Sequence, residues 1–372
     1  MKKRMKFILI MFILLTGANS CQQEQSGEVV TLPTDLTVQI EELGNGRVKA
    51  IFSARDVNFY RIDFGEAKSN MQRVEGQEAT HSYRTPGNYT ITVQAHTTED
   101  AFISEETQVE ITEQALGLGI PTEGYESPES YDGYTLVWRD EFEEGISPDW
   151  VYEIGDGCPN LCGWGNNELQ FYRRENAEVK DGMLVITAKE ENFGGKNYTS
   201  TRMKTQGKQS FTFGRIDFRA VLPKGQGIWP AFWMLGESIT EVGWPACGEI
   251  DIMEMVGGNA SGRDNTTHGT LHWSNNGTYA TSGGKSSLSE GIFNDAFHVF
   301  SIIWDEEKIV WLLDGQEYHT IDITPAHMDE FRDPQFILIN LAIGGNWPGN
   351  PDDSTIFPQQ LVVDYVRVFQ KD

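Results

Sequence analysis

The sequence has few positive charges. Its 372 residues include 29 lysines and arginines against 55 aspartates and glutamates, which gives a formal net charge of −26. Binding to phosphates needs a basic surface, so this balance argues against nucleic acid or an anionic membrane surface as a partner. An uncharged ligand fits the composition better, and the length leaves room for two domains with sizeable cores.

The one conspicuous apolar run is short. Phe7–Leu15 is too short for a stable membrane span, and it follows basic residues and precedes small ones, so Met1–Ser20 is typical of a signal peptide. The next residue is Cys21, and the tripeptide before it resembles a relaxed bacterial lipobox. We therefore expect Cys21 to be the lipidated first residue of the mature protein, with ordinary cleavage nearby as the alternative.

Cysteine is scarce, with four in the whole chain. Cys158 and Cys162 lie four residues apart in a loop rich in Gly, Pro and Asn, and an exported protein permits a disulfide there. A zinc site would need more ligands than this loop offers. Cys247 is expected to be a small buried packing residue and not a nucleophile, because the sequence places no base for it.

Helical periodicity is almost absent, which predicts an all-β chain. After a polar tether over 21–29, strand-like runs over 36–40, 48–52, 59–64 and 89–93 predict a small sandwich over 30–113. A Gly/Pro/Glu-rich stretch over 114–130 predicts a linker, and a second β domain follows over 131–372. Within it, Phe213–Val221 alternates apolar and charged residues like a half-buried antiparallel strand, and hairpins are expected around 305–307 and at Asp314-Gly315.

Three carboxylates lie within six residues of an apolar, β-prone run, Gly248–Met255 (GEIDIMEM). In a regular strand Glu249 and Asp251 would share one face and Glu254 would take the other, but a β-bulge near Met253 would bring all three together. Crowded carboxylates raise each other's pKa, which places a proton donor beside an ionised neighbour. Retaining glycosidases use such a pair about 5–5.5 Å apart. The alternative is an acidic surface strand.

The same stretch carries a family resemblance. Trp244–Glu254 (WPACGEIDIME) resembles the active-site signature of glycoside hydrolase family 16, in the E-x-D-x-x-E form typical of its laminarinase-like, endo-β-1,3-glucanase branch. The resemblance covers roughly 131–372. It implies a concanavalin-like β-jelly-roll of two stacked sheets, with a glycan cleft on the concave face. Residues 81–93 resemble the closing motif of polycystic-kidney-disease-type Ig-like domains, which implies a spacer or a weak glycan-binding module.

Sugar rings need aromatic platforms and polar groups, and the sequence supplies both. Trp229 and Trp233 match the laminarinase-like motif and would share one strand face, unless they are core residues. His268 and His272 would also share a face, and the glutamate of a zincin motif is missing between them. The resemblance places further side chains in the cleft, with His272 bonding sugar or Glu254 and Asn166 binding on the non-reducing side: Asn166, Arg202, His272, Trp244 and Trp347.

The resemblance also implies a structural calcium site. Backbone oxygens near Glu141 and Gly182 and the carboxylate of Asp364 would form it, and such hard oxygen ligands suit this cation. No cofactor is expected for catalysis.

These observations predict a retaining endo-β-glucanase acting on β-1,3-glucan. Mixed-linkage β-1,3-1,4-glucan is the main alternative substrate, and a sulfated polymer would favour a more basic cleft. A non-catalytic glycan-binding protein on the same fold is the rival, because fold alone does not fix function. We expect a monomer whose partner is polysaccharide and which touches a membrane only through a lipid anchor, at the outer membrane or cell surface of a bacterium, or otherwise secreted or periplasmic.

Overall fold

The computed structural model describes residues 30–44, 46–67, 69–258 and 263–372. The expected signal peptide, Cys21 and the tether lie outside the described residues. Within the described chain, no helix has both the length and the apolarity needed to cross a membrane. The chain divides into two compact units, one built from Ala50–Ala79, Tyr89–Val109 and the described residues up to Glu41, the other from Glu42–Lys49, Thr80–Asn88 and Glu110–Asp372.

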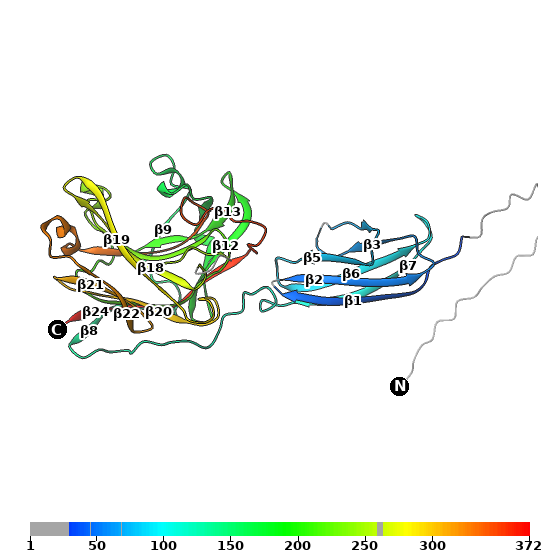
Figure 1. Cartoon of the computed structure of the whole chain (residues 1–372), viewed down its shortest axis with the longest axis horizontal. Helices are drawn as coiled ribbons and strands as arrows, with labels where there is room; N and C mark the ends of the chain where they lie inside the picture. Colours follow the sequence, from blue (N-terminus) through cyan, green and yellow to red (C-terminus); the bar gives the residue numbers. More distant parts are fainter. Residues whose placement is uncertain (1–29, 45, 68, 259–262) are drawn as a thin grey trace, which may run out of the picture. The chain divides into compact units, whose positions relative to one another are not determined.

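The N-terminal strands form two small sheets around a shared core (Figure 1). Buried residues alternate along them, as in Val48, Ala50 and Phe52, and the rings of Phe52 and Tyr60 pack 4.7 Å apart. The strands expected from the sequence are therefore present, together with further ones. The first sheet has the order β1 (Thr34–Gly44), β2 (Arg47–Arg55), β5 (Glu78–Ser82), and the second β4 (Gln72–Val74), β3 (Phe59–Asp63), β6 (Gly87–His96), β7 (Phe102–Ile111).

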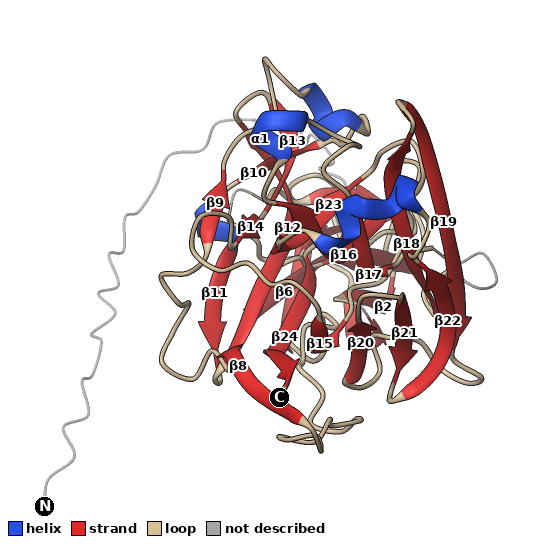
Figure 2. Ribbon diagram, turned by 90° about the vertical axis from the view of Figure 1, so that its left-hand side faces the viewer, coloured by secondary structure: helices blue, strands red, loops and turns tan. Residues whose placement is uncertain are grey.

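The second unit is a sandwich of two large sheets (Figures 1 and 2). The larger sheet is centred on the long strand β24, which pairs with β12, β15 and β8. Its main order is β10 (Gln170–Tyr172), β13 (Lys196–Ser200), β12 (Met183–Phe193), β24 (Gln359–Lys371), β15 (Gly214–Val221), β20 (His298–Trp304), β21 (Lys308–Leu313), β22 (Gln316–Asp322), with β11 (Ala177–Lys180) on β12 and β8 (Tyr134–Asp140) on β24.

The smaller sheet carries the cleft. Its order is β19 (Thr278–Ser287), β18 (Thr266–Asn275), β17 (Glu249–Glu254), β16 (Ile228–Gly236), β23 (Gln335–Ile343), β14 (Arg202–Lys204), β9 (Val151–Glu153). Helical segments are short: η1 (Cys162–Gly165), η2 (Arg174–Asn176), α1 (Ile239–Val242) and η3 (Ala326–Arg332). The all-β jelly-roll expectation is confirmed, as are the hairpins β20–β21 and β21–β22.

The core lies between the two sheets and explains the strand patterns. The rings of Phe218 on β15 and Phe232 on β16 stack across it, with centroids 4.6 Å apart. On β23 every residue is buried, because alternate side chains face the core and the floor of the cleft. Strands buried on both faces favour such continuous apolar runs.

The prediction that Phe213–Val221 is half-buried is wrong. Arg215 and Asp217 are also buried on β15, with Asp217 fully covered. The segment before β8 lies over this face: the Tyr131 hydroxyl donates to Asp217 Oδ2 over 2.8 Å, and the Arg215 guanidinium lies over the Tyr131 ring. A buried ion pair between Arg215 Nε and Asp217 Oδ1, at 2.8 Å, satisfies the two charges. Alternation alone could not show this cover.

Candidate active site

A β-bulge in β17 brings the three carboxylates onto one face, as predicted. Asp251 pairs with Trp233 on β16, but Met253 pairs with Phe232, so Ile252 is the extra residue. Beyond the bulge Glu254 pairs with Ala231, while Glu249 pairs with Leu235. The three acids are therefore opposite alternate residues of β16, all on the cleft side.

The opposite sheet supports the bulge from behind. The indole Nε1 of Trp311, on β21, donates to the backbone oxygen of Asp251 over 2.8 Å. Trp311 reaches β17 because residue 269 on β18 is a glycine: a Cβ there would lie 2.3 Å from the Trp311 ring. Gly269, which separates the two histidines in the sequence, thus has a packing function, and a buried carbonyl oxygen has its partner.

Burial dominates the electrostatics of the three acids. It raises the pKa of Glu249 to about 8, with the negative charge of Asp251 as the next cause, and burial likewise raises the pKa of Asp251. The pKa of Glu254 rises well above its usual value through burial and then the charges of Asp251 and Glu249. The cleft therefore holds fewer than three negative charges at neutral pH, because each ionisation opposes the next.

Each of the three acids has a different polar neighbour. Glu249 Oε2 accepts from Trp244 Nε1 over 2.8 Å, and Asp251 Oδ2 lies 3.1 Å from His272 Nε2. His272 Nε2 is also 3.9 Å from Glu249 Oε1. Glu254 accepts from Trp229 Nε1 over 3.0 Å and faces the other two acids. Since the charges of both Asp251 and Glu249 add to burial in raising the pKa of Glu254, Glu249 or Asp251 ionises before Glu254.

His272 has a different neighbour from the one expected. Its imidazole lies beside Asp251 and Glu249, whereas the cross-strand partner of Glu254 is His268. Both histidines are on the same strand face, as predicted, but the strand pairing assigns His268 to Glu254. Within the described residues, the ligand atoms of Glu249, Asp251 and His272 lie within 4.8 Å of one another. We assign this cluster to proton chemistry, because burial raises the pKa of both of its carboxyls.

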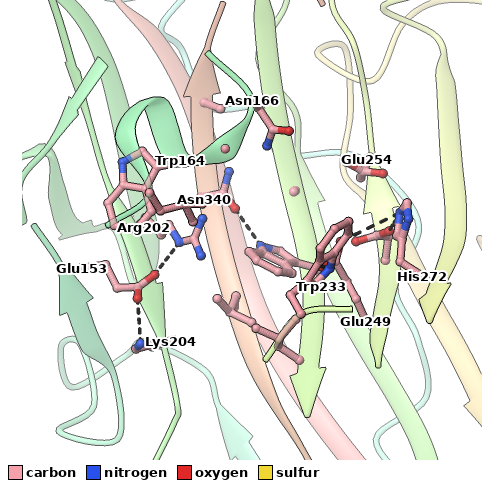
Figure 3. A pocket seen from close by; sticks show the side chains of 18 of the residues that line it. Glu153, Trp164, Asn166, Arg202, Lys204, Trp233, Glu249, Glu254, His272 and Asn340 are labelled. Atoms are coloured by element: carbon pink, nitrogen blue, oxygen red, sulfur yellow. Dashed lines mark hydrogen bonds and ion pairs between the residues drawn. The ribbon is translucent and has the colours of Figure 1, made fainter. Parts of the chain in front are cut away.

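The predicted sugar contacts line one cleft of about 940 Å³ together with the three acids (Figure 3). Trp229 and Trp233 are half-buried and face this cleft, so they are not core residues. Trp347 packs edge-on against Trp229, with centroids 5.7 Å apart, and is exposed like Trp244. Asn166, Arg202 and His272 complete the set.

One side of the cleft, the arginine side, comprises Glu153, Trp164, Asn166, Arg202 and Lys204. The guanidinium of Arg202 lies between the rings of Trp164 and Trp233, at 4.5 and 4.8 Å from their centroids. Its Nε donates to Glu153, which also accepts from Lys204 Nζ over 2.7 Å. Burial would raise the pKa of Glu153, but Arg202 and Lys204 outweigh it and hold that pKa below its usual value. Sequence reasoning missed Glu153 and Lys204.

A buried carboxylate, Glu168, joins the arginine side to the cleft floor. It accepts from Asn166 Nδ2 at 3.2 Å, from Gln170 Nε2 at 2.7 Å and from the Tyr172 hydroxyl at 3.0 Å. That hydroxyl in turn accepts from Asn340 Nδ2 at 3.4 Å, and Asn340 Oδ1 accepts from Trp233 Nε1 at 2.7 Å. Burial raises the pKa of Glu168 despite these donors and the nearby Arg202. The network therefore holds Asn166, on a loop, and Trp233, on β16, in fixed relative positions.

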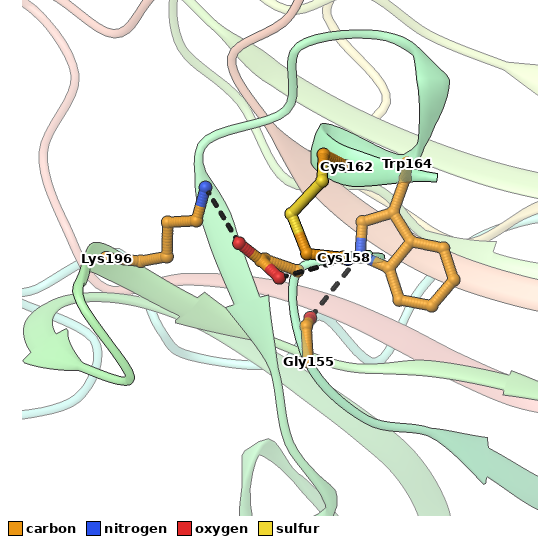
Figure 4. Close-up of a disulfide and its surroundings, with 6 residues drawn as sticks. Gly155, Cys158, Cys162, Trp164 and Lys196 are labelled. Carbon is orange, nitrogen blue, oxygen red and sulfur yellow. Dashed lines mark hydrogen bonds and ion pairs between the residues drawn. A yellow bond between two sulfur atoms is a disulfide. The ribbon is translucent and has the colours of Figure 1, made fainter. Parts of the chain in front are cut away.

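The loop that carries Trp164 and Asn166 contains a disulfide between Cys158 and Cys162 (Figure 4). Trp164 has a φ of 52°, in the left-handed region that few large side chains adopt, and its Nε1 lies 3.4 Å from the Gly155 oxygen. The disulfide therefore closes the turn that presents the Trp164 ring to Arg202. Cys247 is fully buried, and burial raises its thiol pKa to about 11, as expected for a packing residue.

The opposite side of the cleft, the tyrosine side, comprises Trp244, His272 and Tyr279. The Tyr279 hydroxyl lies 2.7 Å from His272 Nδ1, and its ring is stacked on the imidazole, with centroids 5.8 Å apart. Sequence reasoning missed Tyr279. The signal was present: Asn276-Gly277 predicts a two-residue hairpin turn, which places Tyr279 on the same face as His272.

The residues named for calcium converge by strand register. β24 changes partner from β12, at Val363↔Leu184, to β8, at Val366↔Asp140. Asp364 lies at this junction, beside the start of β12 after Gly182 and the end of β8 before Glu141. The register therefore brings these three chain segments side by side. One oxygen of Asp364 accepts from Arg219 Nη1 over 2.6 Å.

Comparison with known proteins fits this geometry. The family model described as "Glycosyl hydrolases family 16" matches residues 165–367 of this chain. The chain belongs to the family 16 glycosyl hydrolases. The β-glucanase of Rhodothermus marinus is 40% identical to this member over 270 residues, covering 68% of this chain and 91% of the relative.

Two further relatives differ in how much of their length is matched. The laminarinase catalytic domain of Thermotoga maritima MSB8 shares 44% identity with a TM-score of 0.60, covering 65% of this chain and all of that one. The clotting factor G alpha subunit of Tachypleus tridentatus is 42% identical over 239 residues, 64% of this chain. The family 16 chain spans only 34% of that relative's length.

Proposed function

We propose that this family 16 glycosyl hydrolase is a retaining endo-β-glucanase that cleaves β-1,3-linked glucan. The observation that carries the proposal is the bulged β17, which presents Glu249, Asp251 and Glu254 on one face of an aromatic cleft. The names of the Rhodothermus and Thermotoga relatives support a β-glucan and, for the second, a laminarin-like substrate.

The proposed mechanism is a double displacement. The Glu249 carboxylate attacks the anomeric carbon, the bond to the leaving oxygen breaks, and that oxygen takes the Glu254 proton. Glu254, now ionised, then removes a proton from water as the water attacks the same carbon and releases Glu249. The hydrogen bond from Trp244 favours ionised Glu249, and the high pKa of Glu254 keeps its proton available. Asp251 and His272 tune both acids.

The decisive experiment is analysis of early products from laminarin, lichenan and agarose by chromatography, with anomeric configuration followed by NMR. We expect a ladder of short oligosaccharides from laminarin with retained configuration. Preferential cleavage of lichenan would favour the alternative, a mixed-linkage β-1,3-1,4-glucanase. Inverted products would overturn the double displacement, and cleavage of agarose alone would overturn the glucanase assignment.

A non-catalytic glycan-binding surface lipoprotein remains the second candidate. One relative is named as a clotting factor subunit and not as a hydrolase, so likeness to the family does not by itself establish turnover. The intact set of three acids favours catalysis, because binding neutral sugar gains nothing from three carboxylates with raised pKa values. Laminarin binding without any product would support the binding protein.

Calcium is proposed as a structural ion near Glu141, Gly182 and Asp364, with no cofactor for catalysis. When bound, the ion would tie the end of β8 to the start of β12, and Arg219 is the competing partner of the Asp364 carboxylate. Addition of a chelator should lower the melting temperature of the wild type and leave that of Asp364→Asn unchanged. An equal response of both proteins would argue against this site.

We also propose export as a monomeric lipoprotein anchored through Cys21, in which a polycystic-kidney-disease-type domain over 30–113 and a linker over 114–130 act as a spacer. The basic and apolar segments before Cys21 support this proposal. Replacement of Cys21 by alanine should release the protein from the membrane fraction. Unmodified Cys21 in mass spectrometry of native protein would count against the anchor.

A further inference from the structure

Two large aromatic side chains on the tyrosine side are exposed without a core function. Trp244 is 52% exposed and Tyr279 is 49% exposed, and their rings lie 5.2 Å apart at 34°. Both line the cleft beside the acids. A wall of two exposed rings next to reactive carboxyls offers an apolar surface of the kind that the flat face of a sugar covers.

The order of strands in the sheet shows how far the two exposed rings lie from the acids. The acids are on β17, Tyr279 is two strands away on β19, and Arg202 is three strands away in the other direction on β14. Neighbouring strands are about 4.8 Å apart, so a chain crossing the sheet has roughly 10 Å on the tyrosine side and roughly 14 Å on the arginine side. The reactive centre is therefore off-centre in the cleft, with the shorter arm ending at Tyr279.

We propose that Tyr279 is a substrate-positioning residue for the sugar on the leaving-group side, where its ring supports that sugar and its hydroxyl fixes His272. The proposal rests on the proposed function and on the role of Asn166, on the arginine side, in binding the non-reducing part of the glucan, which the family resemblance implies. The sugar that departs then lies across β17 from Asn166, against Trp244 and Tyr279.

The hydroxyl has a separate consequence for the acids. His272 Nε2 faces Asp251 Oδ2 at 3.1 Å, within ion-pair distance. The Tyr279 hydroxyl lies 2.7 Å from Nδ1, and when it donates there the ring proton is on Nε2, on the side of Asp251. Tyr279 thereby selects the tautomer that serves Asp251, in the way that a hydrogen bond to one ring nitrogen sets the role of the other.

Two substitutions and two substrates separate the ring from the hydroxyl. Tyr279→Phe keeps the ring, and Tyr279→Ala removes both. The substrates are a β-1,3-gluco-oligosaccharide and a β-glycosyl fluoride with the same non-reducing part, whose fluoride leaving group occupies no sugar position. Thr278→Ala is the matched control, because it changes an exposed neighbour on β19 whose side chain points to the other face. Thermal melts establish that each full-length variant is folded.

Loss of the hydroxyl should lower kcat of Tyr279→Phe by about two- to tenfold on both substrates, the range for one hydrogen bond. Loss of the ring should raise KM of Tyr279→Ala over Tyr279→Phe by about three- to tenfold on the oligosaccharide, and leave the fluoride unchanged. If the KM of Tyr279→Ala exceeded that of Tyr279→Phe by the same factor on both substrates, the proposal would be overturned. Wild-type kinetics for Tyr279→Ala would also overturn it. A wild type that cleaves neither substrate would instead overturn the proposed function, and this inference with it.

Discussion

The arginine side of the cleft is held by buried polar partners, whereas the tyrosine side presents exposed rings. Arg202 is fixed by Glu153 and by two indole faces, and Asn166 is fixed by the buried Glu168. Trp244 and Tyr279 are about half exposed, and the polar contacts they make lead to Glu249 and His272. The first arrangement fixes positions in advance, while the second couples a binding surface to the acids.

This difference suits the two halves of a polysaccharide that is cut between them. In the proposed mechanism, the sugar that becomes attached to Glu249 must be held through two chemical steps, so buried hydrogen bonds that cost no reorganisation are an advantage there. The departing sugar must leave after the first step. An aromatic surface binds this sugar by stacking, which depends less on orientation than hydrogen bonds do and so allows release.

The largest effect should come from the acids that lie between the two sides. Glu254→Gln should lower kcat on laminarin by about 10²–10⁴-fold, the range for a lost general acid–base group, and Glu249→Gln by at least as much. A glycosyl fluoride distinguishes their roles, because fluoride leaves without a proton. Glu254→Gln should still form the glycosyl-enzyme from the fluoride, seen as a mass increase, whereas Glu249→Gln should not. Hydrolysis of laminarin at the wild-type rate by folded Glu249→Gln would remove it as nucleophile.

The next effect should break the arginine side alone. Glu168→Gln replaces one acceptor oxygen by a donor among three donors, which leaves a buried clash of like groups. We expect kcat/KM on laminarin to fall by about tenfold or more, mainly through KM, together with a lower melting temperature. Glu175→Gln, at an exposed position on η2, is the matched control. An unchanged KM would show that Asn166 and Trp233 do not depend on the Glu168 network.

Much of this comparison was within reach of the sequence, and the missing part has a physical reason. The spacing of Glu249, Asp251 and Glu254 predicts the bulge, since no regular strand puts all three acids on one face. The supporting residues are distant in sequence: Glu168 reaches Trp233 through Tyr172 and Asn340, and Trp311 reaches Asp251 from the opposite sheet. Periodicity describes one strand at a time and cannot reveal such contacts.

The error on β15 has the same origin. Alternation of Arg215 and Asp217 with apolar residues predicts a solvated face, but the segment that includes Tyr131 covers it. A charged residue on a strand is compatible with solvent or with a buried partner, and only the fold selects between them. Tyr279 is the opposite case, because the Asn276-Gly277 turn and the position of His272 along the chain are enough to define the strand face on which it lies.

A smaller effect should sharpen the electrostatic link between the two sides. The charge of Asp251 is, after burial, the main cause that raises the pKa of Glu249 and of Glu254. Asp251→Asn removes that charge, so both pKa values should fall and both limbs of the pH profile of kcat/KM should move to lower pH, by about one unit. The alkaline limb should move more, because Asp251 is ionised there. We expect about a tenfold loss of rate at the new optimum, less than for Glu249→Gln.

The measurement is a series of kcat/KM values over pH for wild type and Asp251→Asn on the same oligosaccharide, with anomeric configuration followed by NMR. Asp217→Asn, which alters a buried aspartate of the other sheet, controls for a general loss of stability. Limbs at their wild-type positions would remove Asp251 from the electrostatics of the site. A move to higher pH would reverse the sign of the interaction assigned to it.

The smallest effect should come from the disulfide. Cys158 and Cys162 close a loop of few residues, so the bond restricts the unfolded chain little and acts mainly on the local turn that carries Trp164 and Asn166. Reduction should therefore raise KM for oligosaccharides by about twofold, through looser positioning of Trp164 against Arg202, and leave kcat unchanged.

The double variant Cys158→Ser/Cys162→Ser should behave like the reduced wild type and should not respond to reductant. The disulfide belongs to the arginine side. The ratio of the oligosaccharide KM of Tyr279→Ala to that of Tyr279→Phe should therefore be the same with and without the disulfide. A reductant effect that depends on residue 279 would mean that the two sides of the cleft are not independent.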